Sequence, residues 1–277
     1  MIAQMSEYID IGVNLTGSSF CDDLAEVVQR AQAAGVRRMI VTGTDLEHSQ
    51  RAIELCRQYP ETLYSTVGVH PHHADDFTAS TVEQLRQLVS QECVVAIGEC
   101  GLDYNRNYST MSNQIAAFEA QLELAAELVR PVFLHQRDAH DDFVSILSNA
   151  RSQLCGAVAH CFTGTAAEVE GYLELDMYIG VTGWICDERR GRDLQQAVKE
   201  IPLDKIMLET DAPYLLPRDL AEKPVKNRRN EPCYLPHIAE AVAHYMNVDR
   251  EQLEQAAMVN SRRFFNIEGE RLTEIIA

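Results

Sequence analysis

The sequence predicts a closed barrel of eight parallel strands, each followed by a helix: a (β/α)₈ or TIM-barrel fold. Short apolar runs alternate with longer amphipathic segments along the chain. The runs are rich in Val, Ile, Leu and Met without strict alternation, which is typical of strands buried on both faces. A doubly wound open sheet is the alternative, but eight regular units favour closure. We expect one TIM-barrel domain over residues 1–277.

The predicted strands are Tyr8–Val13, Arg38–Val41, Leu63–Val69, Val94–Ile97, Pro131–Leu134, Gly156–Ala159, Met177–Val181 and Lys205–Leu208. The predicted helices between them are Asp23–Ala34, Leu46–Gln58, Ser80–Ser90, Gln114–Leu128, Asp141–Ala150 and Ala166–Leu175. Gly35 caps the first helix, and Pro131 opens the fifth strand, where its missing donor is tolerated. Two final helices, Pro236–Tyr245 and Arg250–Phe265, are expected to cover the barrel.

The net charge of -18 constrains what the protein can bind. Such a charge repels polyanions, so it argues against broad coating of DNA, which depends on Lys and Arg. A nuclease with this composition must find its positive charge in a bound metal ion and in a few local basic clusters.

The eight cysteines form no Cys-x-x-Cys pair and are spread over a chain too large to need disulfides, so we expect free, buried thiols in a reducing cytosol. The N-terminus has neither the basic nor the apolar region of a signal peptide, and no run approaches the roughly 18 apolar residues of a membrane span. These features indicate a cytoplasmic protein with no membrane association.

Four residues suited to metal binding stand where predicted strands end. Glu99, His135 and His160 end the fourth, fifth and sixth strands, and Asp211 follows the eighth. In a parallel barrel these positions meet at one mouth. The set suits Zn²⁺, Mn²⁺ or Fe²⁺, and it can hold Mg²⁺ when phosphate oxygens of a substrate complete the shell. The cation would lower the pKa of a bound water, with Asp211 as general base or as a further ligand.

A single histidine or glutamate at a strand end is more often structural than functional. Four such residues at four strand ends are hard to explain as coincidence, which favours the metal site. His70, after the third strand, is a candidate to contact the substrate or protonate a leaving group. His72 is interpreted as a surface residue.

Six motifs, together spanning nearly the whole chain, resemble the TatD-type deoxyribonuclease family of amidohydrolase-like barrels. They are Asp10-Ile-Gly-Val-Asn-Leu, Gly68-Val-His-Pro-His, Ala96-Ile-Gly-Glu-Cys-Gly-Leu-Asp103, His135-Gln-Arg-Asp-Ala139, His160-Cys-Phe-Thr-Gly164 and Leu208-Glu-Thr-Asp-Ala-Pro-Tyr214. The resemblance implies Mg²⁺-dependent hydrolysis of phosphodiester bonds, with Mn²⁺ as a substitute, by 3′ to 5′ exonuclease action on single-stranded DNA and RNA, in DNA repair or nucleic-acid turnover. It also implies Glu99, His135 and His160 as metal ligands, with Asp211 beside them and His70 at the catalytic mouth.

One position departs from the family pattern. Many members carry a His-x-His pair after the Asp of the first strand, where this chain has Gly12 and Asn14. We therefore expect one well-held ion at Glu99, His135 and His160, and a weaker second ion that forms only when substrate phosphate and Asp211 supply oxygens. Fewer nitrogen ligands favour Mg²⁺ over Zn²⁺.

Two basic clusters are expected to flank the mouth and bind phosphates. Arg189, Arg190 and Arg192 follow the seventh strand, and Lys223, Lys226, Arg228 and Arg229 follow the eighth. Arg137 lies two residues after His135, and Trp184 and Tyr214 are candidates to stack on bases. We interpret the partners as strand ends of DNA or RNA, bound by a monomer without an obligate protein partner.

Two alternatives remain open. A barrel hydrolase of small esters, amides or phosphotriesters would more often retain the His-x-His pair and a bridging lysine on the fourth strand. A non-enzymatic binding protein on a decayed barrel is supported only by Gly12 and Asn14. Metal-dependent release of mononucleotides would separate the nuclease from both.

Overall fold

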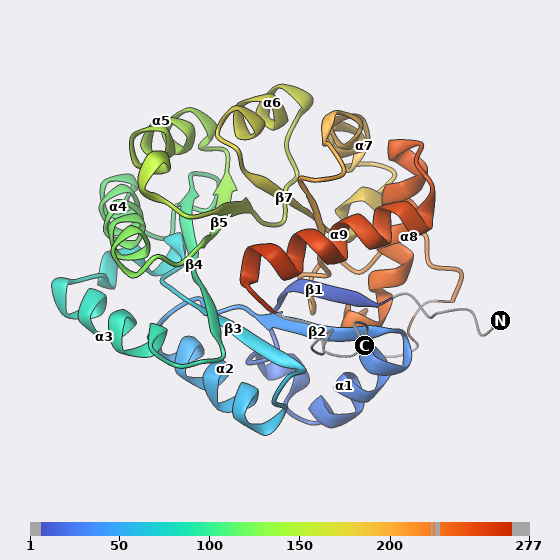
Figure 1. The fold of residues 1–277 in the computed structure, drawn as a ribbon, viewed down its shortest axis with the longest axis horizontal. Helices are drawn as coiled ribbons and strands as arrows, with labels where there is room; N and C mark the ends of the chain where they lie inside the picture. Colours follow the sequence, from blue (N-terminus) through green and yellow to red (C-terminus); the bar gives the residue numbers. More distant parts are fainter. Residues whose placement is uncertain (1–6, 223, 225–227, 268–277) are drawn as a thin grey trace, which may run out of the picture.

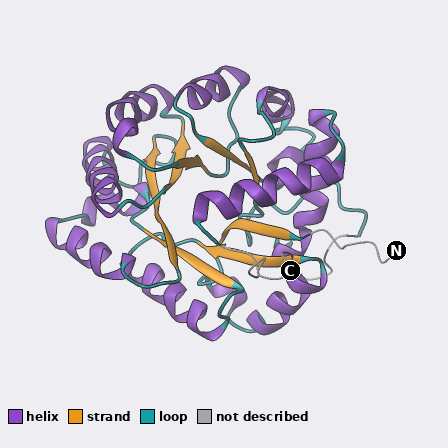
Figure 2. Cartoon of the chain, viewed as in Figure 1, coloured by secondary structure: helices purple, strands orange, loops and turns teal. Residues whose placement is uncertain are grey.

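The computed structural model describes residues 7–222, 224 and 228–267 and forms an eight-stranded parallel barrel, which confirms the predicted fold class (Figure 1). The sheet runs in sequence order, and helices surround it (Figure 2). Its strands are β1 (Tyr8–Val13), β2 (Val36–Val41), β3 (Leu63–Val67), β4 (Val94–Asp103), β5 (Val132–Arg137), β6 (Ala157–Ala159), β7 (Tyr178–Val181) and β8 (Ile206–Leu208). The helices are α1 (Leu24–Ala33), α2 (Leu46–Gln58), α3 (Ala79–Val89), α4 (Met111–Leu128), α5 (His140–Ala150), α6 (Ala166–Glu174), α7 (Arg192–Ala197), α8 (Leu235–Met246) and α9 (Arg250–Phe265).

Local sequence sets the ends of several helices. The side chains of Asp45, Thr165 and Asp249 each accept a backbone N–H from the first turn of α2, α6 and α9, which satisfies a donor that has no partner inside the helix. Helices α8 and α9 end at Asn247 and Asn266 in the left-handed region, with φ of 55° and 52°, a conformation that asparagine adopts readily.

The barrel closes through residues that follow β8. Val13 pairs with Ala212 in a parallel bridge, and the backbone N–H of Asp211 donates to Gly12 O at 2.9 Å. The N–H of Asn14 donates to Ala212 O at 2.7 Å. This seam carries Asn14 and Asp211 to the same mouth, so barrel closure itself builds one wall of the site.

Side chains fill the interior of the barrel, and α9 closes the end opposite the mouth. Ile11, Phe133 and Met207 form a buried cluster with Phe264 and Phe265 from the last turn of α9. The Asn260 amide donates to Leu203 O and Ile206 O at 2.8 Å, where β8 begins. Helix α9 crosses this end in Figure 1. Chemistry is thereby confined to the mouth formed by the carboxyl ends of the strands.

Strand β4 is longer than the apolar run predicted. It continues to Asp103, so Glu99 lies inside the strand and not at its end, and β5 likewise includes His135. Ladder hydrogen bonds depend on the backbone, so polar side chains at the mouth do not end a strand. Two exposed cysteines, Cys21 and Cys155, correct the expectation that the free thiols are buried; no disulfide joins any of the eight.

Two buried glutamines of α4 hold the backbone near the mouth. The Gln121 amide accepts from Val69 N at 2.7 Å and donates to Val69 O at 3.0 Å. Gln114 binds the N–H of Asp103 at 2.8 Å and its carbonyl at 3.2 Å. These residues are seven apart and therefore lie on one face of the helix. Helix α4 thus holds the backbone just after β3 and at the end of β4.

Among the residues that the structure describes, no helix is long and apolar enough to cross a membrane.

Gly101 is required by the close approach of β4 to β5. Its φ is 141°, and a Cβ there would overlap the backbone of His135. We expect Gly101→Ala to lower the free energy of unfolding by roughly 2–6 kcal/mol, because it combines backbone strain with overpacking. Urea denaturation measures this. The matched control is Gly171→Ala in α6, where the nearest atom is 3.5 Å away; there alanine should stabilise by up to about 1 kcal/mol. Equal stability of both variants would contradict the conclusion that the close approach of β4 to β5 requires glycine at position 101.

Candidate metal centre

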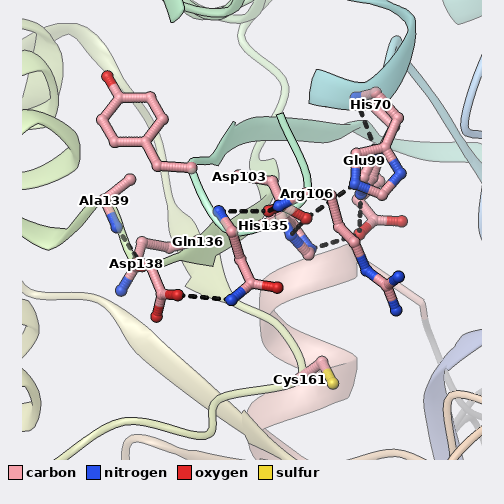
Figure 3. A network of polar contacts seen from close by, with 12 residues as sticks. His70, Glu99, Asp103, Arg106, His135, Gln136, Asp138, Ala139 and Cys161 are labelled. Carbon is pink, nitrogen blue, oxygen red and sulfur yellow. Dashed lines mark hydrogen bonds and ion pairs between the residues drawn. The ribbon is translucent and has the colours of Figure 1, made fainter. Parts of the chain in front are cut away.

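One buried carboxylate gathers three histidines at the mouth. Glu99 is 6% exposed, and its Oε1 lies 2.6 Å from His160 Nε2, 3.0 Å from His135 Nδ1 and 3.4 Å from His70 Nε2. In Figure 3 the labelled side chains of His70, Glu99 and His135 point toward one another. Glu99, His135 and His160, which are predicted as ligands from strand positions, thus meet in one small volume.

The donor set fits a divalent cation. The ligand atoms of His70, Glu99 and His135 all lie within 4.8 Å of one another, and His160 Nε2 contacts the same Glu99 oxygen. Buried His135 Nε2 has no hydrogen-bond partner at hydrogen-bond distance; the nearest acidic oxygen, Asp103 Oδ2, is 3.5 Å away. His160 is not part of this group of mutually close ligand atoms, so ligation by Glu99, His135 and His160 together requires the His160 side chain to adjust.

The group that contacts the second ring nitrogen decides whether each histidine can act as a metal ligand or as a hydrogen-bond donor. His160 Nδ1 lies 3.4 Å from Glu209 Oε2, and His135 Nε2 faces Asp103, so each ring can carry its proton toward a carboxylate and offer a lone pair to an ion. His70 differs, because its Nδ1 accepts the backbone N–H of His72 at 3.1 Å. A neutral His70 therefore carries its proton on Nε2 and is suited to donate a hydrogen bond.

Electrostatics keep the central carboxylate ionised. Burial raises the pKa of Glu99, but the imidazoles of His160, His70 and His135 outweigh burial and hold this pKa well below its usual range. Burial lowers the pKa of His160, yet Glu99 and Glu209 together raise it well above its usual value. For His70, burial dominates and lowers the pKa to about 4, so His70 is neutral at physiological pH. A bound cation would push the pKa of the histidines that bind it downward.

Asp211 stands at the edge of this cluster. Its Oδ1 accepts from the Asn14 amide at 2.9 Å, and Cys161 Sγ lies 3.8 Å from its Oδ2. Burial, together with the carboxylates of Glu99 and Glu209, raises the pKa of Asp211 to about 7, against the lowering effect of His160. Its φ is 53°, which turns the chain sharply after β8. Asp211 thus faces the same mouth, within electrostatic reach of His160 and Glu99.

Glu209 is a further buried acid beside the histidines that the strand pattern did not single out. It is fully buried, accepts the N–H of Cys161 and faces His160. Its carboxylate occupies the space left by glycines: a Cβ on Gly12 would collide with it, and one on Gly180 would lie 2.7 Å from Oε1. Gly12, which departs from the family's His-x-His pair, therefore makes room for Glu209. The signal in the sequence is the spacing of residues 209 and 211, which places two acids on one side of an extended segment.

Asp103 plays the corresponding role for His135. Its Oδ2 lies 2.8 Å from His72 Nε2, and its Oδ1 accepts the backbone N–H of Asn105 and of Arg106. Burial raises the pKa of Asp103, but the nearby His135 imidazole and the hydrogen bonds from Arg106 and His72 outweigh burial and hold this pKa well below the usual range. His72 is thus half-buried in the network, which corrects its interpretation as a surface residue. Residues 99, 101 and 103 share one side of β4, and this periodicity could have indicated Asp103.

The candidate substrate contacts fall into two groups. Arg137, Tyr214 and Arg228 are exposed, and Arg137 lines a cavity of about 250 Å³ beside His160. By contrast, Arg229 donates to Asp23 Oδ1 and Oδ2 at 2.7 Å and to Glu231 Oε1 at 2.6 Å, so its guanidinium holds the loop to the barrel.

The arginines after β7 are paired within their own loop. Asp187 accepts the backbone N–H of Arg189 and of Arg190 and binds Arg190 Nε at 2.9 Å. The Arg190 guanidinium lies over the ring of half-buried Trp184 at 4.4 Å, so one face of that ring is covered. Lys223 and Lys226 lie outside the described residues.

A parallel barrel whose mouth gathers imidazoles around a buried carboxylate defines the class of metal-dependent barrel hydrolases. The chain belongs to the TatD-related DNase family, whose model matches residues 9–266. A "3′-5′ ssDNA/RNA exonuclease TatD" from Erwinia tasmaniensis is 52% identical over 93% of this chain and 99% of its own length. The protein of the same name from Citrobacter rodentium is 54% identical over 93% of this chain and 97% of its own.

Solved structures agree with this assignment. A TatD homologue from Escherichia coli has a TM-score of 0.86 and 28% identity, over 95% of this chain and 99% of that one. A TatD-family hydrolase from Entamoeba histolytica has the same TM-score and identity, over 94% and 98%. A phosphotriesterase homology protein from Escherichia coli, at 14% identity and a TM-score of 0.69, shares the fold.

Glu209 should tune the metal affinity through His160. We expect Glu209→Gln to weaken binding of Mn²⁺ about 10- to 100-fold, because the neutral amide no longer orients and polarises the ring. Titration calorimetry measures the dissociation constant, and circular dichroism checks the fold. Glu123→Gln removes the same charge from an exposed position on α4 and should leave the affinity unchanged. Wild-type affinity in Glu209→Gln would show that His160 does not depend on this contact.

Proposed function

We propose that this protein is a divalent-metal-dependent 3′ to 5′ exonuclease that removes nucleotides from the ends of single-stranded DNA and RNA. The observation that carries the proposal is the convergence of His135 and His160 on Glu99, each histidine backed by its own carboxylate. The TatD relatives, at more than half identity over most of the chain, support the substrate and the polarity.

We assign the cation to Mg²⁺, with Mn²⁺ as a substitute. Glu99, His135 and His160 would hold it, and Asp211 and substrate phosphate would add oxygens. A weaker second ion would depend on those oxygens. When bound, the cation supplies Lewis-acid polarisation of the phosphodiester and lowers the pKa of water. The remaining chemistry falls to side chains at the mouth.

Asp211 and His70 would act on opposite sides of the reaction, Asp211 on the attacking water and His70 on the leaving oxygen. Asp211 would take the proton from the attacking water, and the Asn14 amide keeps its carboxylate in place at 2.9 Å. His70, neutral with its proton on Nε2, would donate a hydrogen bond to the oxygen that leaves when the phosphodiester breaks, and that oxygen would take its proton from solvent. Gln121 holds the residue before His70 by both backbone groups, which limits the freedom of that donor.

Binding of only a few nucleotides at a strand end is compatible with the strongly negative net charge of this protein. The small cavity beside His160 is mostly polar: Arg137 is the one arginine or lysine among its described lining residues, and Asp138, Glu168 and Asp193 also line it. Tyr214 and Arg228 are exposed on the segment after β8. With a net charge of -18, a longer track along nucleic acid would meet repulsion.

We place the protein in the cytoplasm as a monomer, acting in DNA repair or nucleic-acid turnover. Eight free cysteines, two of them exposed, fit a reducing compartment.

The nuclease proposal is tested on single-stranded DNA labelled at its 5′ end. With Mg²⁺ we expect a ladder that shortens from the 3′ end, and EDTA should abolish it because the cation is removed. His135→Ala should slow the reaction by at least about 10³-fold, because it removes a ligand.

His244→Ala is the matched control, since it deletes an exposed histidine in the last turn of α8 and should cut at the wild-type rate. An intact strand in both Mg²⁺ and Mn²⁺ would sink the nuclease proposal. Immediate release of a 5′-labelled mononucleotide would instead show that digestion starts from the 5′ end.

The exposed arginines are tested by their effect on KM. Arg137→Ala and Arg228→Ala should each raise KM about 3- to 10-fold at low salt and flatten its dependence on salt, because each loses one phosphate contact. The measurement is initial rate against strand concentration at several salt concentrations. Arg86→Ala, whose partner Glu127 lies on α4, should leave both quantities unchanged. An unaltered KM in both mouth variants would exclude these arginines as phosphate contacts.

A further inference from the structure

A second group of metal-ligating side chains lies outside the mouth described above. It consists of Cys186, which ends the short 3₁₀ helix Gly183–Cys186 after β7, Asp219 from the segment after β8, and His237 from the first turn of α8. One ligand atom from each lies within 4.8 Å of the other two. His237 Nε2 is 2.7 Å from Asp219 Oδ1. Three distant parts of the sequence therefore present a thiol, a carboxylate and an imidazole to one point.

We propose that Cys186, Asp219 and His237 form a second metal site that binds a zinc-like transition-metal ion. Sulfur, nitrogen and oxygen donors of these three types are the ligands that Zn²⁺ takes in proteins, with bonds of about 2.0–2.3 Å. Softer thiolate and imidazole ligands also select against Mg²⁺, which prefers oxygen. The second site thus differs in chemistry from the Mg²⁺ centre proposed at the mouth.

Without an ion Cys186 is a neutral thiol beside the Asp219 carboxylate, and a cation would allow the thiol to bind as a thiolate. Burial raises the pKa of the Cys186 thiol, and the neighbouring Asp219 carboxylate raises it further. A thiolate at this position needs a positive partner. A divalent ion would displace the thiol proton to solvent, and its two charges would match those of one thiolate and one carboxylate.

The arrangement does not suit a cysteine nucleophile. In such a site the imidazole lies between the thiol and the carboxylate, so that it can take the thiol proton. Here Asp219 contacts both His237 and Cys186, which places the carboxylate in the middle. Three ligand atoms around a common point fit the binding of a metal ion better than the transfer of a proton from the thiol to the imidazole.

Solvent can reach the site, and a fourth position is available. The side chains of Asp219 and His237 are 51% and 31% exposed, whereas Cys186 is buried. An ion can therefore enter from the outer side and complete its tetrahedral shell with water. The buried thiol forms the floor of the site.

A bound ion would fasten the two loops that frame the catalytic mouth. The segment after β8 carries Asp211 and Tyr214 before it reaches Asp219, and its Arg218 already pairs with Glu188 of the loop after β7 at 3.1 Å. Metal at Cys186 would add a second tie between these loops and anchor both to α8. The expected role is structural, since the site stiffens the wall of the mouth.

Cobalt spectroscopy tests the proposal in the full chain. In the Glu99→Ala background, which removes the central carboxylate of the mouth, Co²⁺ should produce the near-ultraviolet charge-transfer band of a cobalt–thiolate bond. Cys186→Ser should abolish the band. Cys161→Ser is the matched control, because Cys161 lies beside Asp211 at the mouth and its loss should leave the band in place. No band, or a band that survives Cys186→Ser, would overturn the site.

Zinc titration supplies a second readout with variants at exposed positions. In the Glu99→Ala chain we expect one tightly bound Zn²⁺ and a higher melting temperature when it binds. His237→Gln and Asp219→Asn, each partly exposed, should fold normally and weaken this affinity at least about tenfold. Undiminished binding in both variants, or no tight Zn²⁺ in the Glu99→Ala chain, would overturn the proposal. The nuclease proposal is tested separately, on the wild-type chain, so failure of one proposal can be told from failure of the other.

Discussion

The contact between the Glu99 carboxylate and the imidazoles around it is the interaction on which the rest of the site depends. A carboxylate this deeply buried is costly unless positive or hydrogen-bonding groups surround it. Three histidines meet one of its oxygens at 2.6, 3.0 and 3.4 Å, which keeps it ionised without full exposure to water. The same arrangement prepares the site for a cation, because an ion placed among these atoms satisfies the carboxylate and the ring nitrogens together.

Each neighbouring feature can be understood as support for that contact. Glu209 and Asp103 face the second nitrogens of His160 and His135 and so orient the lone pairs. Gly12 is small because the Glu209 carboxylate fills the space beside it. At the other end of the barrel, α9 seals the core with Phe264 and Phe265. Apolar side chains fill that closed end, whereas the charged groups of the site lie at the mouth.

The sequence predicted the barrel, but it could not show which side chains become neighbours at the mouth. Glu99, His135 and His160 were identifiable because each is a ligand type near the end of a strand. Glu209 and Asp103 were not, since their importance comes from the ring that each one faces. Arg229 looked like a phosphate contact as part of a basic run, yet Asp23, more than two hundred residues away, occupies its guanidinium.

By itself the sequence determined the eight strands, most of the helices between them and the placement of the candidate metal ligands near the carboxyl ends of strands, because hydrophobic periodicity and strand direction are local properties. Tertiary structure alone decided which histidines offer a lone pair and which one offers a proton. His70 differs from His135 and His160 only in that its second nitrogen meets a backbone N–H where theirs face carboxylates. That distinction depends on distances of a few ångströms between chain segments far apart in the sequence, and no pattern along the chain encodes such distances directly.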